Sequence, residues 1–246
     1  EEVEGFVYIV SHDLRAPLVN LQGFSQELEA SARKLRDWLR DVPLPDEFAA
    51  SVREELEKGI PDALHYITAS SARFERLIEA LLRLSRSGRQ EYHPERLDIG
   101  VMVAATLDSI KEPIRRHGAE VTVGPLPPAW GDRTAVEQVF ANLIVNAVHY
   151  LDPKRPGKIE VRGEERDGAS HYWVRDNGVG LTSLAQKRLF QVFQRFHPTL
   201  APGEGMGLAL VKRIVERHGG KIWAESRESE GTTFHFTLAG PQEGKD

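Results

Sequence analysis

The chain has no cysteine among its 246 residues, which excludes a disulfide scaffold, a cysteine nucleophile and a thiolate metal site. It has no apolar run near the roughly 18 residues that a membrane span requires, and no signal peptide. It also has no excess of positive charge, because 32 Lys and Arg residues stand against 37 Asp and Glu residues, for a net charge of −5. This balance argues against a protein that works on nucleic acid.

The composition is that of a globular protein, with 40% hydrophobic and 28% charged residues, and the length suits one large domain or two smaller ones. Before residue 88, two stretches repeat apolar residues in steps of three and four, which is the pattern of a heptad seam. The first seam comprises Phe6, Val10, Leu14, Pro17, Leu21, Phe24 and Leu28. The second comprises Ile60, Leu64, Ile67, Ser71, Phe74, Ile78, Leu81 and Ser85.

A proline-rich turn at residues 42–45 separates the two seams and predicts a hairpin of two long helices, the second capped by Asp46. Pro17 predicts a kink in the first helix, and Gly59-Ile60-Pro61 predicts a bend or break in the second. One hairpin offers too little partner surface for two seams. We therefore predict that two chains associate into a four-helix bundle.

Beyond a linker at residues 86–98 the pattern becomes mixed. Helices are predicted at 99–117, 132–151 and 205–218, and strands at 120–123, 158–164, 170–176, 220–226 and 232–238. The two runs at 158–164 and 170–176 flank Glu-Arg-Asp-Gly, which predicts a β-hairpin. The predicted fold class is α+β with two domains, a helical hairpin at 1–88 and an α/β domain at 89–246.

His12 lies on the side of its helix that faces away from the seam, since it is two residues from both Val10 and Leu14, or roughly 200° around the helix. A solvent-facing imidazole is largely neutral at pH 7 and is then a nucleophile. Asp13 beside it could raise its basicity. Taken alone, His12 is more simply an ordinary surface histidine, so its interpretation depends on the rest of the chain.

Three clusters after residue 130 have the composition of a nucleotide site. Asn142 and Asn146 share a helix face, and amide oxygens suit Mg²⁺ beside phosphates, although a polar helix face would look the same. Asp176-Asn177-Gly178-Val179-Gly180 follows a predicted strand, where an aspartate can accept a hydrogen bond from an adenine amino group or simply form a turn. Gly203, Gly205 and Gly207 open a helix whose amides could face phosphate, yet neither common nucleotide-binding motif is present.

In this order the clusters closely resemble the motifs of the sensor histidine kinases of two-component signalling. Ser11–Leu18 resembles the H box, Asn142–Asn146 the N box, Asp176–Gly180 the G1 box, Phe190–Phe196 the F box and Gly203–Gly207 the G2 box. Glu230-Gly231-Thr232-Thr233-Phe234 resembles the closing glycine motif. The resemblance covers nearly the whole chain, and it implies a dimeric helical hairpin followed by an α/β sandwich that binds ATP, of the gyrase, chaperone and histidine-kinase type.

The resemblance implies a role for each matching residue. His12 would be the phospho-acceptor, with Asp13 as its activating acid, and Arg195 would contact the γ-phosphate. Asn146 would bind Mg²⁺, and Asn142 would lie beside the phosphates of ATP.

The same resemblance assigns the adenine side of the site. Asp176 would recognise the adenine amino group, with Tyr150 packed on the ring and His149 near phosphate. The glycines that would shape the pocket and its lid are Gly178, Gly180, Gly203, Gly205 and Gly207.

The implied activity is that of an ATP-dependent protein-histidine kinase, which autophosphorylates His12 and passes the phosphoryl group to an aspartate of a response regulator. The implied partners are a second copy of the chain, through residues 1–88, and the receiver domain of that regulator. Because the sequence opens at Glu1, we expect a cytoplasmic fragment whose upstream sensor region, and any membrane anchor, lies outside it.

Two residues depart from the family pattern. His149 stands where a lysine is usual, so ATP affinity is expected to be modest or pH-dependent. Ala16 stands four residues after His12, where family members that dephosphorylate their regulator place Thr or Asn, and alanine has no polar atom to orient water. We therefore expect weak or absent phosphatase activity.

Two other functions remain open at this point. A hydrolytic ATPase of the same fold would need a glutamate where Asn142 stands, because an amide cannot act as a general base. A non-enzymatic phosphotransfer or scaffold module would require a degenerate nucleotide site, and the intact Asn146, Asp176 and glycines argue against that.

Overall fold

The computed structural model describes residues 2–40, 42, 45–89, 92–194, 196, 200 and 205–239. The chain forms two compact units, Glu1–Arg86 and Ser87–Asp246. No helix in the described ranges combines the length and apolar character that a bilayer span requires.

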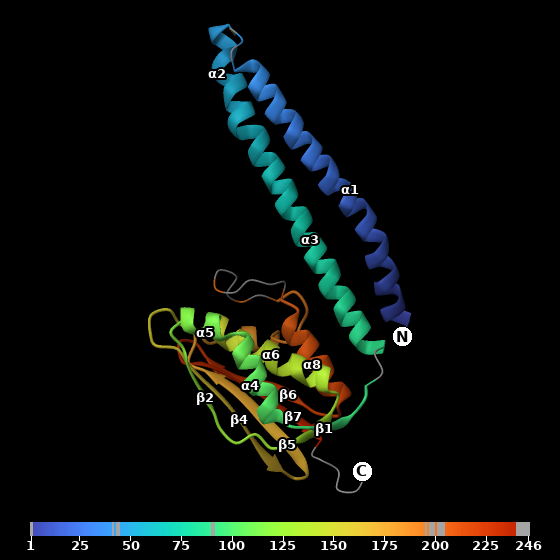
Figure 1. Ribbon diagram of the computed structural model, residues 1–246, viewed down its shortest axis with the longest axis vertical. Coiled ribbons are helices and arrows are strands. Elements are labelled where there is room, and N and C mark those ends of the chain that lie inside the picture. Colours follow the sequence, from blue (N-terminus) through green and yellow to red (C-terminus); the bar gives the residue numbers. More distant parts are fainter. Residues whose placement is uncertain are drawn as a thin grey trace. The chain divides into compact units, whose positions relative to one another are not determined.

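The first unit is a helical hairpin (Figure 1). Helix α1 (Glu2–Leu39) continues through Pro17, and α2 (Asp46–Glu54) leads through a π-helical turn, η1 (Glu55–Gly59), into α3 (Ile60–Arg89). The predicted cap at Asp46 is wrong, because Pro45 is the N-cap residue of α2 and no side chain caps its first turn. The predicted bend at Gly59–Pro61 takes the form of the π turn, in which the amide of Ile60 donates to the carbonyl of Glu55.

Of the predicted seams, only the second is buried in part within one chain, at Leu64, Ser71 and Ile78, and no described residue of the first seam is buried. Described side chains buried in the hairpin are Leu18, Ser25 and Ala32 on α1 and Leu64, Ser71, Ile78 and Leu82 on α3. Both buried hydroxyls bond to their own helix, Ser25 to the carbonyl of Leu21 and Ser71 to that of Ile67. The α1 seam residues Leu14, Leu21, Phe24 and Leu28 are instead exposed. The seams therefore present apolar surface that the chain's own hairpin does not cover.

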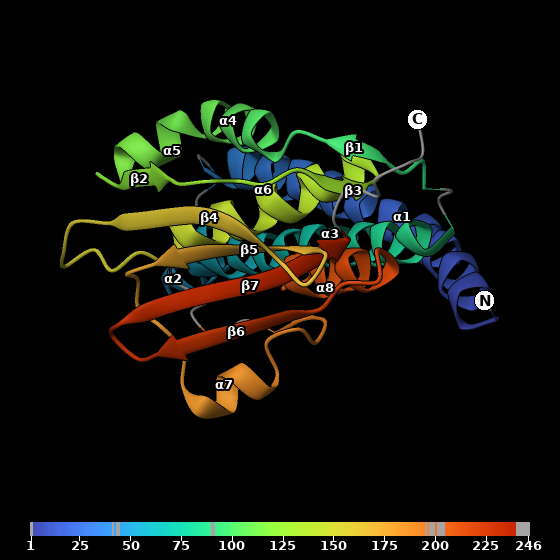
Figure 2. The ribbon, with the colours of Figure 1, turned by 90° about the horizontal axis from the view of Figure 1, so that it is seen from below.

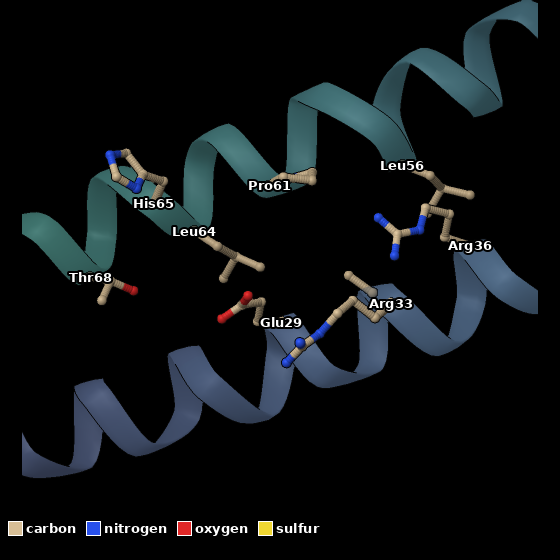
Figure 3. Close-up of a pocket in the computed structure, with 9 residues that line it drawn as sticks. Glu29, Arg33, Arg36, Leu56, Pro61, Leu64, His65 and Thr68 are labelled. Atoms are coloured by element: carbon tan, nitrogen blue, oxygen red, sulfur yellow. The ribbon is translucent and has the colours of Figure 1, made fainter.

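A cavity of about 240 Å³ lies between α1 and the η1–α3 segment. Leu64 and Glu29 point toward each other across it, and Arg33 and Arg36 line it from α1 (Figure 3). Pro61, which has no amide hydrogen, lines it where the π turn ends. The cavity shares no residue with the sequence motifs.

The second unit is a two-layer α/β domain. Its five-stranded sheet has the order β2-β4-β5-β7-β6, with only β2 and β4 parallel among the described strands. The strands are β2 (Glu120–Val123), β4 (Lys158–Arg166), β5 (Ala169–Asp176), β6 (Ile222–Arg227) and β7 (Gly231–Ala239). Helices α4 (Ile99–Ser109), α6 (Arg133–His149) and α8 (Gly207–Arg217) cover one face of this sheet (Figures 1 and 2).

The core lies between α6 and the centre of the sheet. Phe140 from α6 meets Tyr172 from β5 and Phe236 from β7 edge to face, with ring centroids 5.5 and 5.1 Å apart. All three rings are fully buried. This packing fixes α6, which carries Asn142 and Asn146, against the strand that ends at Asp176.

All five predicted strands and the predicted β4–β5 hairpin are confirmed, with the hairpin turning through Asp167 and Gly168 at φ values of 53° and 74°. The single helix predicted at 99–117 is wrong, since α4 ends before Ile110 and α5 (Lys111–Arg116) begins after it. Pro113 lacks the amide that would continue α4. Three further short elements were not predicted, β1 (Glu95–Leu97) paired with β3 (Ala129–Gly131), and α7 (Ser183–Lys187).

Candidate functional site

Asp176 ends β5 with its carboxylate turned into the domain, and it is 5% exposed. Its Oδ1 accepts from the amides of Gly178 and Thr232, at 2.8 and 3.2 Å. Burial raises the pKa of Asp176 to about 6, while these two amides and the charge of Arg155 act in the opposite direction. With Oδ1 engaged, Oδ2 accepts no hydrogen bond from any described residue, so the carboxylate can accept one from a ligand amino group.

The turn after Asp176 has no room for side chains. A Cβ atom at Gly178 would collide with the carbonyl of Tyr150, and one at Gly180, whose φ is +66°, would collide with that of Arg227. Gly231, at φ +111°, lies equally close to the carbonyl of Asp176. The glycines therefore let three backbone segments meet around the carboxylate.

Asn142 and Asn146 lie on α6, and both are partly buried. The Nδ2 of Asn142 donates to the carbonyl of Gln138 at 2.7 Å, which leaves its Oδ1 directed at the start of α8. A Cβ atom at Gly207 would lie 2.6 Å from that Oδ1. The N-terminus of α8, which attracts anions, thus meets the amide of Asn142, and two clusters 65 residues apart in the sequence come together.

Gly205 adopts a φ of +72° and lies against the backbone of Gln194, so a Cβ atom there would collide with it. His149 is half-buried near the end of α6, where burial and the nearby charge of His117 lower its pKa. The carbonyl of Tyr150 accepts from the amide of Val179 at 2.9 Å.

Arg195 and Gly203 lie outside the described residues. His12 and Asp13 are part of α1, but their side chains are not described, so the outward orientation of His12 stays a prediction.

Two residues that were not predicted from the sequence stabilise this site through hydrogen bonds to its backbone. Asn177 joins the end of β5 to the start of β4, accepting from the amide of Lys158 at 2.7 Å and donating to the carbonyl of Pro156 at 2.9 Å. Arg155 donates to the carbonyl of Gly178 at 2.7 Å. Asn177 lies inside the Asp176–Gly180 motif, which could have signalled its role, whereas Arg155 is one arginine in a loop and carries no signal.

The described residues contain no group of three His, Cys, Asp or Glu side chains able to hold a metal ion. A divalent cation bound here would therefore depend on an amide oxygen, such as that of Asn146, together with oxygens of a ligand. The buried acceptor, the glycine turns and the helix N-terminus that faces Asn142 fit a nucleotide better than a metal centre alone.

Two family models match the chain. The model described as histidine kinase-, DNA gyrase B-, and HSP90-like ATPase matches residues 131–242, and the His Kinase A (phospho-acceptor) domain matches residues 2–90. The chain belongs to the sensor histidine kinases. The predicted family and the predicted two-part fold, a helical hairpin followed by an ATPase domain, are thereby confirmed.

Similar histidine kinases and other relatives align over almost all of this chain. The phytochrome-like protein Cph1 of Synechocystis is 32% identical over 96% of the chain, and cyanobacterial phytochrome B of Nostoc is 34% identical over 97%. The chain spans 29% of the length of each. Full-length ShkA, solved in complex with AMPPNP, has a TM-score of 0.63 at 22% identity and covers 96% of this chain and 46% of its own, which shows the same fold.

Proposed function

We propose that this chain is the kinase core of a two-component sensor, in which His12 takes the γ-phosphoryl group of ATP. The observation that carries the proposal is the contact of Gly207 with the amide of Asn142, in the same domain as the buried Asp176, which keeps one carboxylate oxygen for a ligand. The His Kinase A (phospho-acceptor) match over residues 2–90 supports an acceptor histidine in the hairpin.

The proposed reaction is an in-line transfer. A ring nitrogen of His12 attacks the γ-phosphorus, the bond from phosphorus to the β–γ bridging oxygen breaks, and ADP leaves. The carboxylate of Asp13 accepts a hydrogen bond from the other ring nitrogen, which raises the basicity of the attacking nitrogen, and it takes up that proton as the phosphorus–nitrogen bond forms. Asn146 is the residue proposed to hold Mg²⁺, which would neutralise phosphate charge during the transfer. Arg195 is proposed to contact the γ-phosphate, and Tyr150 the adenine ring.

Radiolabelled transfer tests the proposal. Incubation of the chain with γ-labelled ATP is expected to give acid-labile, base-stable label on the protein, and His12→Ala is expected to remove it. His65→Ala is the matched control, because His65 is an exposed histidine of the same hairpin. Release of free phosphate without protein label would instead indicate a hydrolytic ATPase, and the absence of both would indicate a scaffold.

We propose that the chain works as a homodimer, because the apolar seam of α1 is exposed in a single copy. The phosphoryl group is proposed to pass from His12 to an aspartate on the receiver domain of a response regulator, as expected for a two-component kinase. We propose that this module lies in the cytoplasm and is joined to a sensor region in the whole protein.

Phosphatase activity toward the regulator is proposed to be weak or absent, because Ala16 cannot orient a water molecule. The measurement is the loss of label from a purified phosphorylated regulator with and without this chain. Rapid loss that depends on the kinase would contradict the proposal, and Ala16→Thr is the variant expected to increase that loss.

A further inference from the structure

Arg155 lies in the loop between α6 and β4, and its side chain is about two-thirds buried, being 35% exposed. Its Nη2 donates to the carbonyl of Gly178 at 2.7 Å. Its Nε is buried without a hydrogen-bond partner in the described part of the chain and lies 3.8 Å from the nearest carboxylate oxygen of Asp152. An ion pair of that length contributes little by itself, so the bond to Gly178 is the stronger contact.

That bond holds one end of the peptide unit that joins Gly178 to Val179. The other end is held as well, because the amide of Val179 donates to the carbonyl of Tyr150 at 2.9 Å. Gly178 also donates its own amide to Oδ1 of Asp176. The orientation of this peptide unit, and with it the position of the Asp176 carboxylate, is therefore tied to Arg155.

We propose that Arg155 is a positioning residue of the nucleotide site, which orients the Asp176–Gly180 turn and keeps the Asp176 carboxylate in its hydrogen-bond-accepting form. The inference rests on the proposed function, because it gives Asp176 the task of accepting from the adenine amino group. Arg155 itself touches the turn and not the nucleotide.

The positive charge of Arg155 also lowers the pKa of Asp176. The groups that act on this carboxylate are the amide of Gly178 in the same turn, the amide of Thr232 from β7 and the guanidinium of Arg155. Arg155 is the charged side chain among them. Without it, burial is opposed only by the two amides, and the pKa of Asp176 rises further above its ordinary value. The ligand-accepting carboxylate is then lost at a higher pH.

The experiment measures the affinity of the whole chain for a fluorescent ATP analogue from about pH 5.5 to about pH 8.5. Wild type is expected to lose affinity toward the acid end. Arg155→Met is expected to move the midpoint of that loss upward and to weaken binding about tenfold near neutral pH, because a charge-assisted bond is lost. Lys154→Met is the matched control, since it removes the same charge from an exposed neighbour in the same loop, and it is expected to behave like wild type.

Arg155→Lys separates charge from geometry. It keeps the charge but loses the planar fork, so the midpoint is expected to stay near that of wild type while affinity falls across the whole range. This variant also provides the test if Arg155→Met does not fold. Wild-type affinity and an unmoved midpoint in the Arg155 variants would overturn the inference. Wild type that binds no nucleotide at any pH would overturn the proposed function together with it.

Discussion

A carboxylate buried as deeply as that of Asp176 destabilises the domain that contains it. Its pKa in the folded chain, about 6, lies above the ordinary value of 3.8, so the folded state binds the proton more tightly than the unfolded state. The destabilisation is fully present above about pH 6 and is relieved as the pH falls toward about 4. The proposed role of Asp176, which is to accept a hydrogen bond from the adenine amino group, gives a reason for retaining a charged residue there.

Asp176→Asn is therefore expected to separate stability from binding. At neutral pH the variant should unfold with a free energy about 1–3 kcal/mol higher than wild type in the absence of nucleotide, because it no longer buries a charge. Its affinity for ATP should fall about tenfold or more, since an amide offers a weaker acceptor to the adenine amino group. Urea unfolding and nucleotide titration of the same preparations check both parts. A variant with lower stability than wild type and unchanged affinity would contradict the assignment.

At the scale of elements, two glycines that have no neighbouring atoms where a Cβ would lie differ in their backbone conformation. A Cβ atom at Gly23, within α1, would meet no atom within 4 Å, and the same holds for Gly118, which follows α5 at a φ of +57°. Gly23→Ala is expected to stabilise the hairpin by about 0.5–1 kcal/mol, because alanine has the higher helix propensity. Gly118→Ala is expected to destabilise its domain by about 1 kcal/mol, because the left-handed conformation strains alanine. Thermal unfolding followed by circular dichroism compares them, and a stabilising Gly118→Ala would show that the positive φ is not required.

Elements with a strong period or a clear turn signal could be predicted from the sequence, and elements without either could not. Strand β5 could be predicted because the turn sequence Glu-Arg-Asp-Gly precedes it, although its buried positions include the polar Ser170 and Asp176. Strands β1 and β3 have three residues each, too few to show any alternation. The π turn could be predicted only as a disruption at Gly59–Pro61, since a proline signals a lost bond but not how the neighbouring turn accommodates it.

The same limit applies to the site. The Asn142, Asp176 and Gly207 clusters could be recognised because each has a local pattern. The contact between Gly207 and Asn142 depends on how α8 packs on α6, and the bond from Arg155 to Gly178 depends on a loop conformation. Neither contact could be predicted from a local sequence pattern, because both join residues that are far apart in the chain.

At the scale of the whole molecule, the exposed seam of α1 bears on the number of chains. Leu21, Phe24 and Leu28 are 46%, 65% and 58% exposed in one copy, which places a row of large apolar side chains in water. A heptad pattern shows which face is apolar but not which neighbour covers it. A second copy is the partner that the predicted four-helix bundle supplies.

Phe24→Glu is expected to convert a dimeric chain into a monomer, because it would bury a charge in the seam between the copies. Val19→Glu is the matched control, since Val19 is also exposed, at 55%, but lies off the seam. Light scattering after size-exclusion chromatography gives the mass of each variant. A dimeric Phe24→Glu chain would show that the copies associate through another surface.

The two ends of the β4–β5 hairpin differ, because one carries Asp176 of the candidate site and the other is a surface turn. Asp176 is paired with Ile159 at one end, while the turn through Asp167 and Gly168 closes the other. Seven further pairs lie between the Asp176 pair and the turn, which at about 3.4 Å per residue amounts to roughly 24 Å. Because the ladder between them sets the register, a peptide tag or a fluorophore inserted at the turn would leave the nucleotide end undisturbed, and this makes the turn a practical attachment point for labelling the catalytic domain.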